Sequence, residues 1–274
     1  MKWYITATIM VAVGIVMFVT VMSINKWDFT KLSTVEYETN SYELTEDFSS
    51  IKIDIDTADI VFEKSEDNKC RVECFEDAKS RHEVKVEDGT LVITVNDERK
   101  WYHNISVSFQ SVKIKIYLPK TEYDKLEIDS STGDIRIDCM TFKDMEIDLS
   151  TGDIDLNSID CVNDIKVKVS TGEVLLSDVT CGNLNSEGST GDIILKKVVA
   201  TKKFNIERST GDVKFEDCDA AEIKVETSTG SVKGNFLTSK NIIAKSSTGK
   251  VDVPKNTEGG KCEITTSTGD IKIK

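Results

Sequence analysis

Residues 126–156 read LEIDSSTGDIRIDCMTFKDMEIDLSTGDIDL and contain two copies of one pattern. In each copy, apolar residues alternate with polar ones before and after the tripeptide Ser-Thr-Gly. The tripeptide occurs eight times, and neighbouring copies are 19 or 20 residues apart. Self-similarity at a fixed period of this length predicts a repeat architecture. The copies begin at Ser131, Ser150, Ser170, Ser189, Ser209, Ser228, Ser247 and Ser267.

The alternation predicts β-strands, because a period of two belongs to a strand and not to a helix. The segments between copies are too short for the helical crossovers of a doubly wound sheet, and a propeller blade needs about forty residues. The pattern therefore predicts an all-β protein: a parallel β-solenoid of about eight regular coils, with equivalent strands paired in parallel. We expect a right-handed coil and, at about 4.8 Å per coil, a rod about 40 Å long.

The glycine of each copy is predicted to form a structural corner. Glycine adopts backbone conformations closed to other residues, and Ser and Thr hydroxyls can bond the backbone groups that a bend leaves free. The corner glycines are Gly133, Gly152, Gly172, Gly191, Gly211, Gly230, Gly249 and Gly269.

The amino-terminal segment, residues 1–27, is predicted to be a membrane anchor. No residue from Ile5 to Ile24 is charged, and about twenty such residues span a bilayer as a helix. A cleaved signal peptide is the alternative, but its apolar core is normally shorter and no clear small-x-small cleavage site is present. The charge rule does not fix the orientation, because Lys2 on one side faces Lys26 and Lys31 on the other.

The rest of the chain divides into three predicted parts: a spacer over 28–47, an irregular β lead-in and cap over 48–120, and the Ser-Thr-Gly solenoid over 121–274. Within the lead-in, Asp56-Thr57-Ala58-Asp59-Ile60 resembles a degenerate corner, and residues 84–93 predict a hairpin around Asp88-Gly89. Residues 105–118 predict a longer strand or strand pair. The final Ile271-Lys272-Ile273-Lys274 is expected to form an exposed edge that its lysines protect.

Composition excludes one class of partner. The formal net charge of −13 leaves no basic face for nucleic acid and disfavours electrostatic attachment to anionic lipid. Seven cysteines and two histidines match no zinc spacing. Cys139, Cys161, Cys181, Cys218 and Cys262 are predicted to be small buried residues, and stacking would bring Cys161 and Cys181 within disulfide range.

One row of side chains is a candidate site. The residues that follow the first five corner glycines are acidic: Asp134, Asp153, Glu173, Asp192 and Asp212. Stacked carboxylates could bind calcium or a cationic polymer, or they could form a solvated ladder suited to the turn. The second interpretation is favoured, so we predict no metal and no cofactor.

Catalysis is not expected. The repeats hold Arg136 and Arg208 as their only arginines and contain no histidine, and Ser-Thr-Gly lacks the flanking pattern of a nucleophile elbow. Trp101-Tyr102-His103 is an aromatic cluster that could contact a sugar or a membrane surface, although packing on the body is the simpler role.

The anchor, the irregular lead-in, the strand end Leu118-Pro119-Lys120 and the serial Ser-Thr-Gly-Asp-Ile corners together resemble the bacterial "putative adhesin" family of β-strand-repeat proteins, a domain of unknown function. The resemblance covers about Phe48 to Lys274. It implies a single-pass cell-membrane protein of the envelope, with no catalytic residues to carry over. From the solenoid faces we expect the partner to be a protein or a cell-wall polymer. We interpret the chain as a non-enzymatic envelope protein that displays a rigid solenoid for structural, adhesive or interaction roles. An accessory or sensory component of an envelope-stress system is the alternative, and a carbohydrate-active β-helix enzyme is a more distant one.

Overall fold

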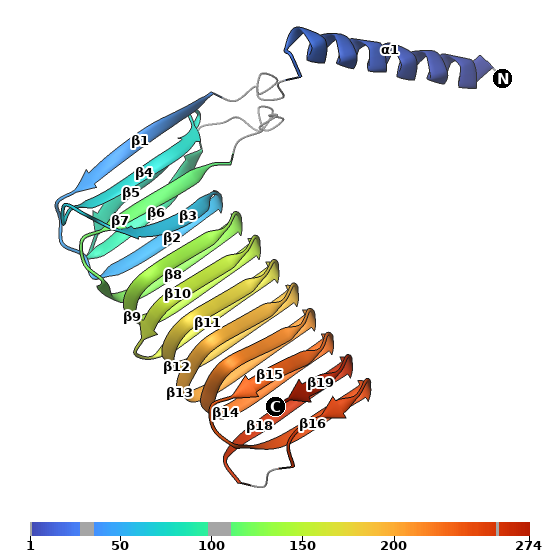
Figure 1. The fold of residues 1–274 in the computed structure, drawn as a ribbon. Coiled ribbons are helices and arrows are strands. Elements are labelled where there is room, and N and C mark those ends of the chain that lie inside the picture. Colours follow the sequence, from blue (N-terminus) through green and yellow to red (C-terminus); the bar gives the residue numbers. More distant parts are fainter. Residues whose placement is uncertain (1, 28–35, 98–110, 256–257) are drawn as a thin grey trace.

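A computed structural model describes residues 2–27, 36–97, 111–255 and 258–274. An amino-terminal helix, α1 (Lys2–Ile24), precedes a body built from strands (Figure 1). The stretch Ala7–Ile24 within α1 is long and apolar enough to cross a membrane. The strands are β1 (Tyr37–Leu44), β2 (Ser50–Thr57), β3 (Asp59–Lys64), β4 (Cys70–Asp77), β5 (Ser80–Glu87), β6 (Thr90–Asp97), β7 (Lys113–Leu118), β8 (Glu122–Thr132), β9 (Ile135–Thr151), β10 (Ile154–Cys161), β11 (Asp164–Thr171), β12 (Val174–Thr190), β13 (Ile193–Thr210), β14 (Val213–Thr229), β15 (Val232–Phe236), β16 (Lys240–Thr248), β17 (Val251–Asp252), β18 (Gly260–Thr268) and β19 (Ile271–Ile273).

The predicted parallel β-solenoid is confirmed. Equivalent strands of successive coils pair in parallel and in register, so that Ile154 lies between Ile135 and Val174. All three side chains are at most 1% exposed and belong to one continuous apolar core. Each coil adds another layer to these columns, so the core extends along the whole body.

A second bend follows five of the eight corners, where the sequence predicts a loose polar turn. Six residues after five of the corner glycines, the backbone adopts φ of 51–55° at Cys139, Ser158, Asp178, Lys197 and Asp217. This left-handed conformation is uncommon outside glycine, and all five side chains are exposed. The prediction of a buried Cys139 is therefore wrong, because this cysteine occupies the outward-facing bend. The other four repeat cysteines are buried as predicted.

The carboxyl-terminal coils do not stack in chain order. β18 lies between β14 and β16, and β19 lies between β15 and β17. The last coil of the chain is thus inserted between two earlier ones. Ile271 and Ile273 are 0% and 4% exposed, so the expectation that they form an exposed edge is wrong. β16 and β17 form the edge instead, and the more apolar last coil is covered on both sides.

The amino-terminal coils are also out of order. β2 lies between β8 and β6, and β3 lies between β7 and β9. The degenerate corner is confirmed: Thr57 pairs with Thr132, and the Ala58 amide donates to the Thr132 carbonyl at 3.0 Å. The hairpin of β5 and β6 is confirmed too, with φ of 48° at Asp88 and 72° at Gly89, as the common two-residue hairpin turn requires.

Part of the predicted spacer belongs to the body. β1 pairs antiparallel with β4 along its whole length, and the Tyr37 ring stacks on Phe75 with centroids 5.0 Å apart. The strand was missed because its polar sequence YETNSYEL contains only weak alternation. β7 begins at Lys113, and the predicted residues 105–110 and the cluster Trp101-Tyr102-His103 lie outside the described residues.

A carboxylate on the surface of β8 predicts acid sensitivity. Hydrogen bonds from Lys125 and Lys52 lower the pKa of Glu127 to about 2, from 4.5. A lowered pKa in the folded state stabilises the fold above the unfolded value, and this stabilisation disappears as pH falls through the folded value. We expect the thermal midpoint to fall between about pH 4.5 and pH 2, and to fall less in Glu127→Gln. Circular dichroism of the full chain in detergent measures this, with Glu46→Gln as the exposed control; equal pH profiles for all three proteins would contradict it.

Candidate interaction surface along the corner ridge

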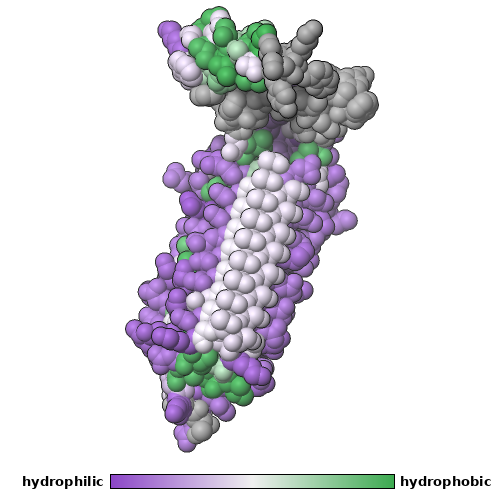
Figure 2. Space-filling view, turned by 90° about the vertical axis from the view of Figure 1, so that its right-hand side faces the viewer, coloured by the Kyte–Doolittle hydropathy of each residue, from purple (hydrophilic) through white to green (hydrophobic). Residues whose placement is uncertain are grey.

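The eight Ser-Thr-Gly corners stack into one continuous strip, which we call the corner ridge. Every Ser and Thr of the eight copies is exposed, and Figure 2 shows the ridge as a pale stripe between hydrophilic flanks. Backbone hydrogen bonds join the layers: the Gly172 amide donates to the Thr190 carbonyl at 2.9 Å, and six of the other seven corner glycines make the same bond. The backbone therefore supports the ridge and leaves the hydroxyl groups available to solvent or a ligand.

The corner glycines are required for two independent reasons. Seven of the eight adopt φ between 127° and 153°, a region that side-chain-bearing residues rarely enter. The layers also approach too closely for a side chain. A Cβ on Gly191 would lie 2.0 Å from the Gly172 carbonyl oxygen, and the other corners would place it 1.9–2.1 Å from the neighbouring carbonyl.

The acidic row lies along one side of the ridge and has a structural role. Its carboxylates accept hydrogen bonds from the backbone of the next coil. The Asp134 Oδ1 atom accepts from the Asp153 amide at 3.0 Å, and Asp153 Oδ1 accepts from the Glu173 amide at 2.7 Å. Asp192 accepts from the Asp212 amide at 2.8 Å. Asp is suited to this position because its short side chain reaches an amide one layer away.

Nearby cations partly balance the row. The Lys214 Nζ atom lies 2.8 Å from Asp192 Oδ2. Burial raises the pKa of Asp192, but hydrogen bonds from Lys214 and the Asp212 amide outweigh this and lower it below the ordinary value. Farther along, Asp134, Asp153 and Glu173 line a groove of about 290 Å³ together with Arg136.

Cation binding by the row can be tested directly. In four of the five carboxylates, one oxygen already accepts a hydrogen bond from a backbone amide. We therefore expect millimolar calcium to leave the thermal midpoint of the full chain unchanged. Differential scanning fluorimetry with calcium and with a magnesium control measures this. A calcium-specific rise that Asp153→Asn abolishes would show instead that the row binds the ion.

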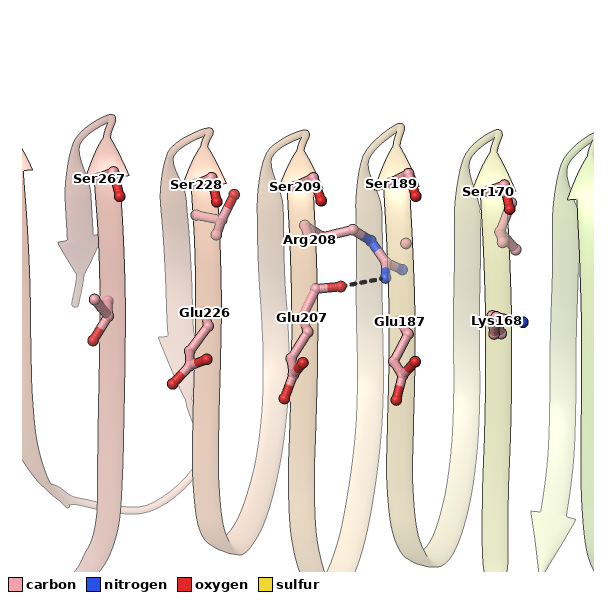
Figure 3. A pocket seen from close by; sticks show the side chains of 14 residues that line it. Lys168, Ser170, Glu187, Ser189, Glu207, Arg208, Ser209, Glu226, Ser228 and Ser267 are labelled. Atoms are coloured by element: carbon pink, nitrogen blue, oxygen red, sulfur yellow. Dashed lines mark hydrogen bonds between the residues drawn. The ribbon is translucent and has the colours of Figure 1, made fainter.

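A second groove, of about 590 Å³, lies on the other side of the ridge. Figure 3 shows its two parallel rows, which we call together the serine groove: hydroxyls of the corner serines and, below them, three glutamates. Lys168 ends the lower row. The groove is open and polar, and it crosses several coils, so it suits an extended ligand. Its rows are Ser170, Ser189, Ser209, Ser228 and Ser267, and Glu187, Glu207 and Glu226.

A buried arginine lies beneath the serine groove. Arg208 is 5% exposed and occupies a column in which the adjacent coils carry Gly188 and Thr227 and more distant coils carry Val169 and Leu149. Its guanidinium donates to the Glu207 carbonyl and to Ser186 Oγ, each at 2.9 Å, and no carboxylate pairs with it among the described residues. Burial lowers the pKa of Arg208 to about 10.

Gly188 provides the space for Arg208. A Cβ on Gly188 would lie 2.7 Å from Arg208 Nη1. We expect Gly188→Ala alone to destabilise the protein by about 1–2 kcal/mol, because overpacking displaces the guanidinium. In an Arg208→Leu background the same substitution should be neutral, giving a coupling energy of about 1–2 kcal/mol in a double-mutant cycle. Additive effects in chemical denaturation would contradict this contact.

The cap holds a separate polar cluster, formed by Cys74, Glu76 and His82. It is the one group of three potential metal ligands within 4.8 Å found among the described residues. The Glu76 carboxylate accepts from the His82 amide and lies 2.6 Å from His82 Nδ1, and it also accepts from Asn40 at 2.6 Å. Glu76 is 0% and His82 5% exposed. These bonds occupy the carboxylate, so the cluster is a buried hydrogen-bond centre of the cap.

The structure brings the predicted corner glycines together in one strip and the acidic residues in one row. It leaves Cys161 and Cys181 as free thiols in adjacent coils. The burial of the charged residues Arg208 and Glu76 was not predicted from the sequence. It was predictable, because each residue occupies an inward position of an alternating strand.

The fold and the ridge define a class of protein: a parallel β-solenoid whose coils turn at Ser-Thr-Gly corners and which follows an apolar helix. The chain belongs to the Toastrack DUF4097 family, which matches residues 48–163 and 157–274. This confirms the fold class and the resemblance to adhesin-like proteins of unknown function.

Two solved structures from Parabacteroides distasonis share the fold. One, described as a putative lipid binding protein, has 19% identity and a TM-score of 0.57, and the match covers 88% of this chain and 98% of that one. The other, described as a putative adhesin, has 14% identity and a TM-score of 0.54, covering 87% and 98%. At these identities the likeness concerns the fold alone. No curated protein matches the chain.

Proposed function

We propose that this is a non-enzymatic envelope protein, which α1 anchors in the cell membrane and whose solenoid is displayed outside as an adhesive or interaction module. The corner ridge is the observation that carries the proposal. It presents the same pair of hydroxyls in every copy, so a polymer with a regular repeat, such as a cell-wall glycan, makes equivalent contacts coil after coil. The adjoining serine groove adds charged groups over the same length.

The arrangement of reactive groups supports a binding role. The acidic row is engaged with backbone amides, and the Cys74–Glu76–His82 cluster is almost fully buried in the cap. Among the described residues, the exposed surface of the repeats follows one regular pattern, whereas an active site usually interrupts such a pattern.

The proposed location is tested by protease treatment of intact cells that produce the full chain. We expect the solenoid epitope to be lost from intact cells and a short fragment containing α1 to remain with the membrane. A cytoplasmic marker protein serves as the control for lysis. Protection of the solenoid in intact cells, with digestion after lysis, would place it inside and refute display.

The proposed surface is tested by binding of the detergent-solubilised full chain to purified cell-wall material. We expect Ser189→Gln with Ser209→Gln to weaken binding at least fivefold, because larger side chains block the ridge and the serine groove. Lys196→Gln with Lys202→Gln changes two exposed positions away from the ridge and should leave binding unchanged. Equal losses for both pairs, or turnover of the glycan, would overturn the proposed role.

A further inference from the structure

One end of the solenoid carries an unpaired strand edge. β16 pairs with β18, and β17 pairs with β19, while the described residues supply no strand on their other side. Asn183 occupies the position of Asn241 in an earlier coil, and its amide donates to Asn163 of the preceding coil. Peptide groups of successive strand residues point to opposite neighbours. Asn241, Ile243 and Lys245 therefore face β18, whereas Ile242, Ala244 and Ser246 direct their peptide groups toward the open side.

The apolar columns are uncovered at the same end. Ile242 and Ala244 are partly exposed, whereas the residues that precede them in the stack on β18, Cys262 and Ile264, are fully buried. A solenoid normally ends in a repeat with a polar outer face. This end lacks such a face, so an additional strand would continue its core.

Exposed hydrophobic side chains surround the open edge. Leu237 is 58%, Ile243 57% and Val251 44% exposed. Figure 2 shows hydrophobic surface at this end of the body, directly beneath the ridge. We call this hydrophobic patch and the unpaired edge together the open end, which consists of β16, β17 and Leu237.

The open end is basic, although the whole protein is acidic. Residues 233–274 contain eight lysines and four acidic residues, whereas the full chain has a formal charge of −13. Lys245, Lys250 and Lys255 are exposed, and none of them forms an ion pair with a described residue. Charge at this end therefore selects an acidic partner.

The same lysines argue against pairing between two copies of this end. An edge-to-edge dimer would bring the lysines of both copies together, and like charges across a strand pair are unfavourable. A strand from another protein avoids this repulsion if it carries Asp or Glu. Its apolar residues would cover Ile242 and Ala244, and its acidic residues would lie outside, opposite Lys245.

We propose that the open edge of β16 binds an extended acidic segment of a partner protein, which adds as a further strand. In this mode, backbone hydrogen bonds give affinity and alternate side chains give specificity. The inference goes beyond the ridge function and does not depend on it, since the serine groove contains no residue of β16 or β17 and the ridge meets the open end only at the Ser247-Thr248 corner.

The test uses the full chain in detergent micelles and a fluorescent eight-residue peptide that alternates Glu with Ile or Val. We expect saturable binding by anisotropy, and at least tenfold weaker binding by Lys245→Glu with Lys250→Glu. Ala244→Pro should also weaken binding at least tenfold, because it removes an edge donor without breaking an internal ladder bond. Lys196→Glu with Lys202→Glu is the matched control and should bind like the wild type.

Several outcomes would overturn the proposal. A peptide with Lys in place of Glu that binds equally well would exclude charge selection. Binding that survives Ala244→Pro but disappears in the lysine variant, together with adsorption to anionic vesicles, would assign the open end to an anionic surface. Concentration-dependent dimers that Ala244→Pro disrupts would assign it to a second copy. The ridge variants and cell-wall binding are unaffected in each case, so the two proposals fail separately.

Discussion

Gly191→Ala is expected to cost at least about 3 kcal/mol of stability, a large effect for one methyl group. The backbone at Gly191 has φ of 127°, a conformation that costs other residues about 1–3 kcal/mol. The new Cβ would also lie 2.0 Å from the Gly172 carbonyl oxygen. That oxygen belongs to a rigid corner, so relief requires a shift of the coil. Chemical denaturation of the full chain in detergent measures the loss.

Ser189→Ala is the matched control in the same corner. Its side chain is exposed, so we expect a change within about 0.5 kcal/mol. Limited proteolysis should place new cleavage sites near residue 191 only in the glycine variant. A loss below about 1 kcal/mol for Gly191→Ala would mean that the corners tolerate side chains, and the structural account of the ridge would fail.

Glu76→Ala is expected to destabilise the cap by about 3–5 kcal/mol, the usual cost of breaking a buried pair. The carboxylate accepts from the His82 amide and from Asn40 and contacts His82 Nδ1, all at 2.6 Å. Burial raises the pKa of Glu76, but these hydrogen bonds lower it below the ordinary value overall. Without Glu76, the buried His82 amide and His82 Nδ1 lose their partner, and Asn40 keeps only its hydrogen bond to Glu38.

Two variants separate this effect from a general loss of charge. Glu73→Ala removes a surface partner of Arg71 on the same strand and should cost less than about 1 kcal/mol. Glu76→Gln keeps one oxygen acceptor and should fall between the two. Hydrogen exchange should show faster exchange in β4 and β5 for Glu76→Ala alone. Equal stability of the Ala variants at positions 73 and 76 would contradict the cap assignment.

The repeats made the solenoid predictable, because eight copies give the same period and the same apolar columns. The Asp-to-amide bonds of the acidic row were not predictable, since they depend on the distance between layers. Stacking order was also hidden. Nothing in a parallel repeat states which coil is the neighbour, so the position of β18 between β14 and β16 could not be predicted from it. The polar β1 lacked the alternation on which the prediction relied.

The exchange of strand order at both ends has a consequence for assembly. Terminal segments normally fray first. Here β19 lies between two strands that are synthesised before it, and β2 lies between two strands that are synthesised after it. Zippering from one terminus to the other cannot produce this order. The coil of β18 and β19 can enter the stack only after β14 to β17 have been made, and β19, with a strand on each side, is not an edge from which unravelling can start.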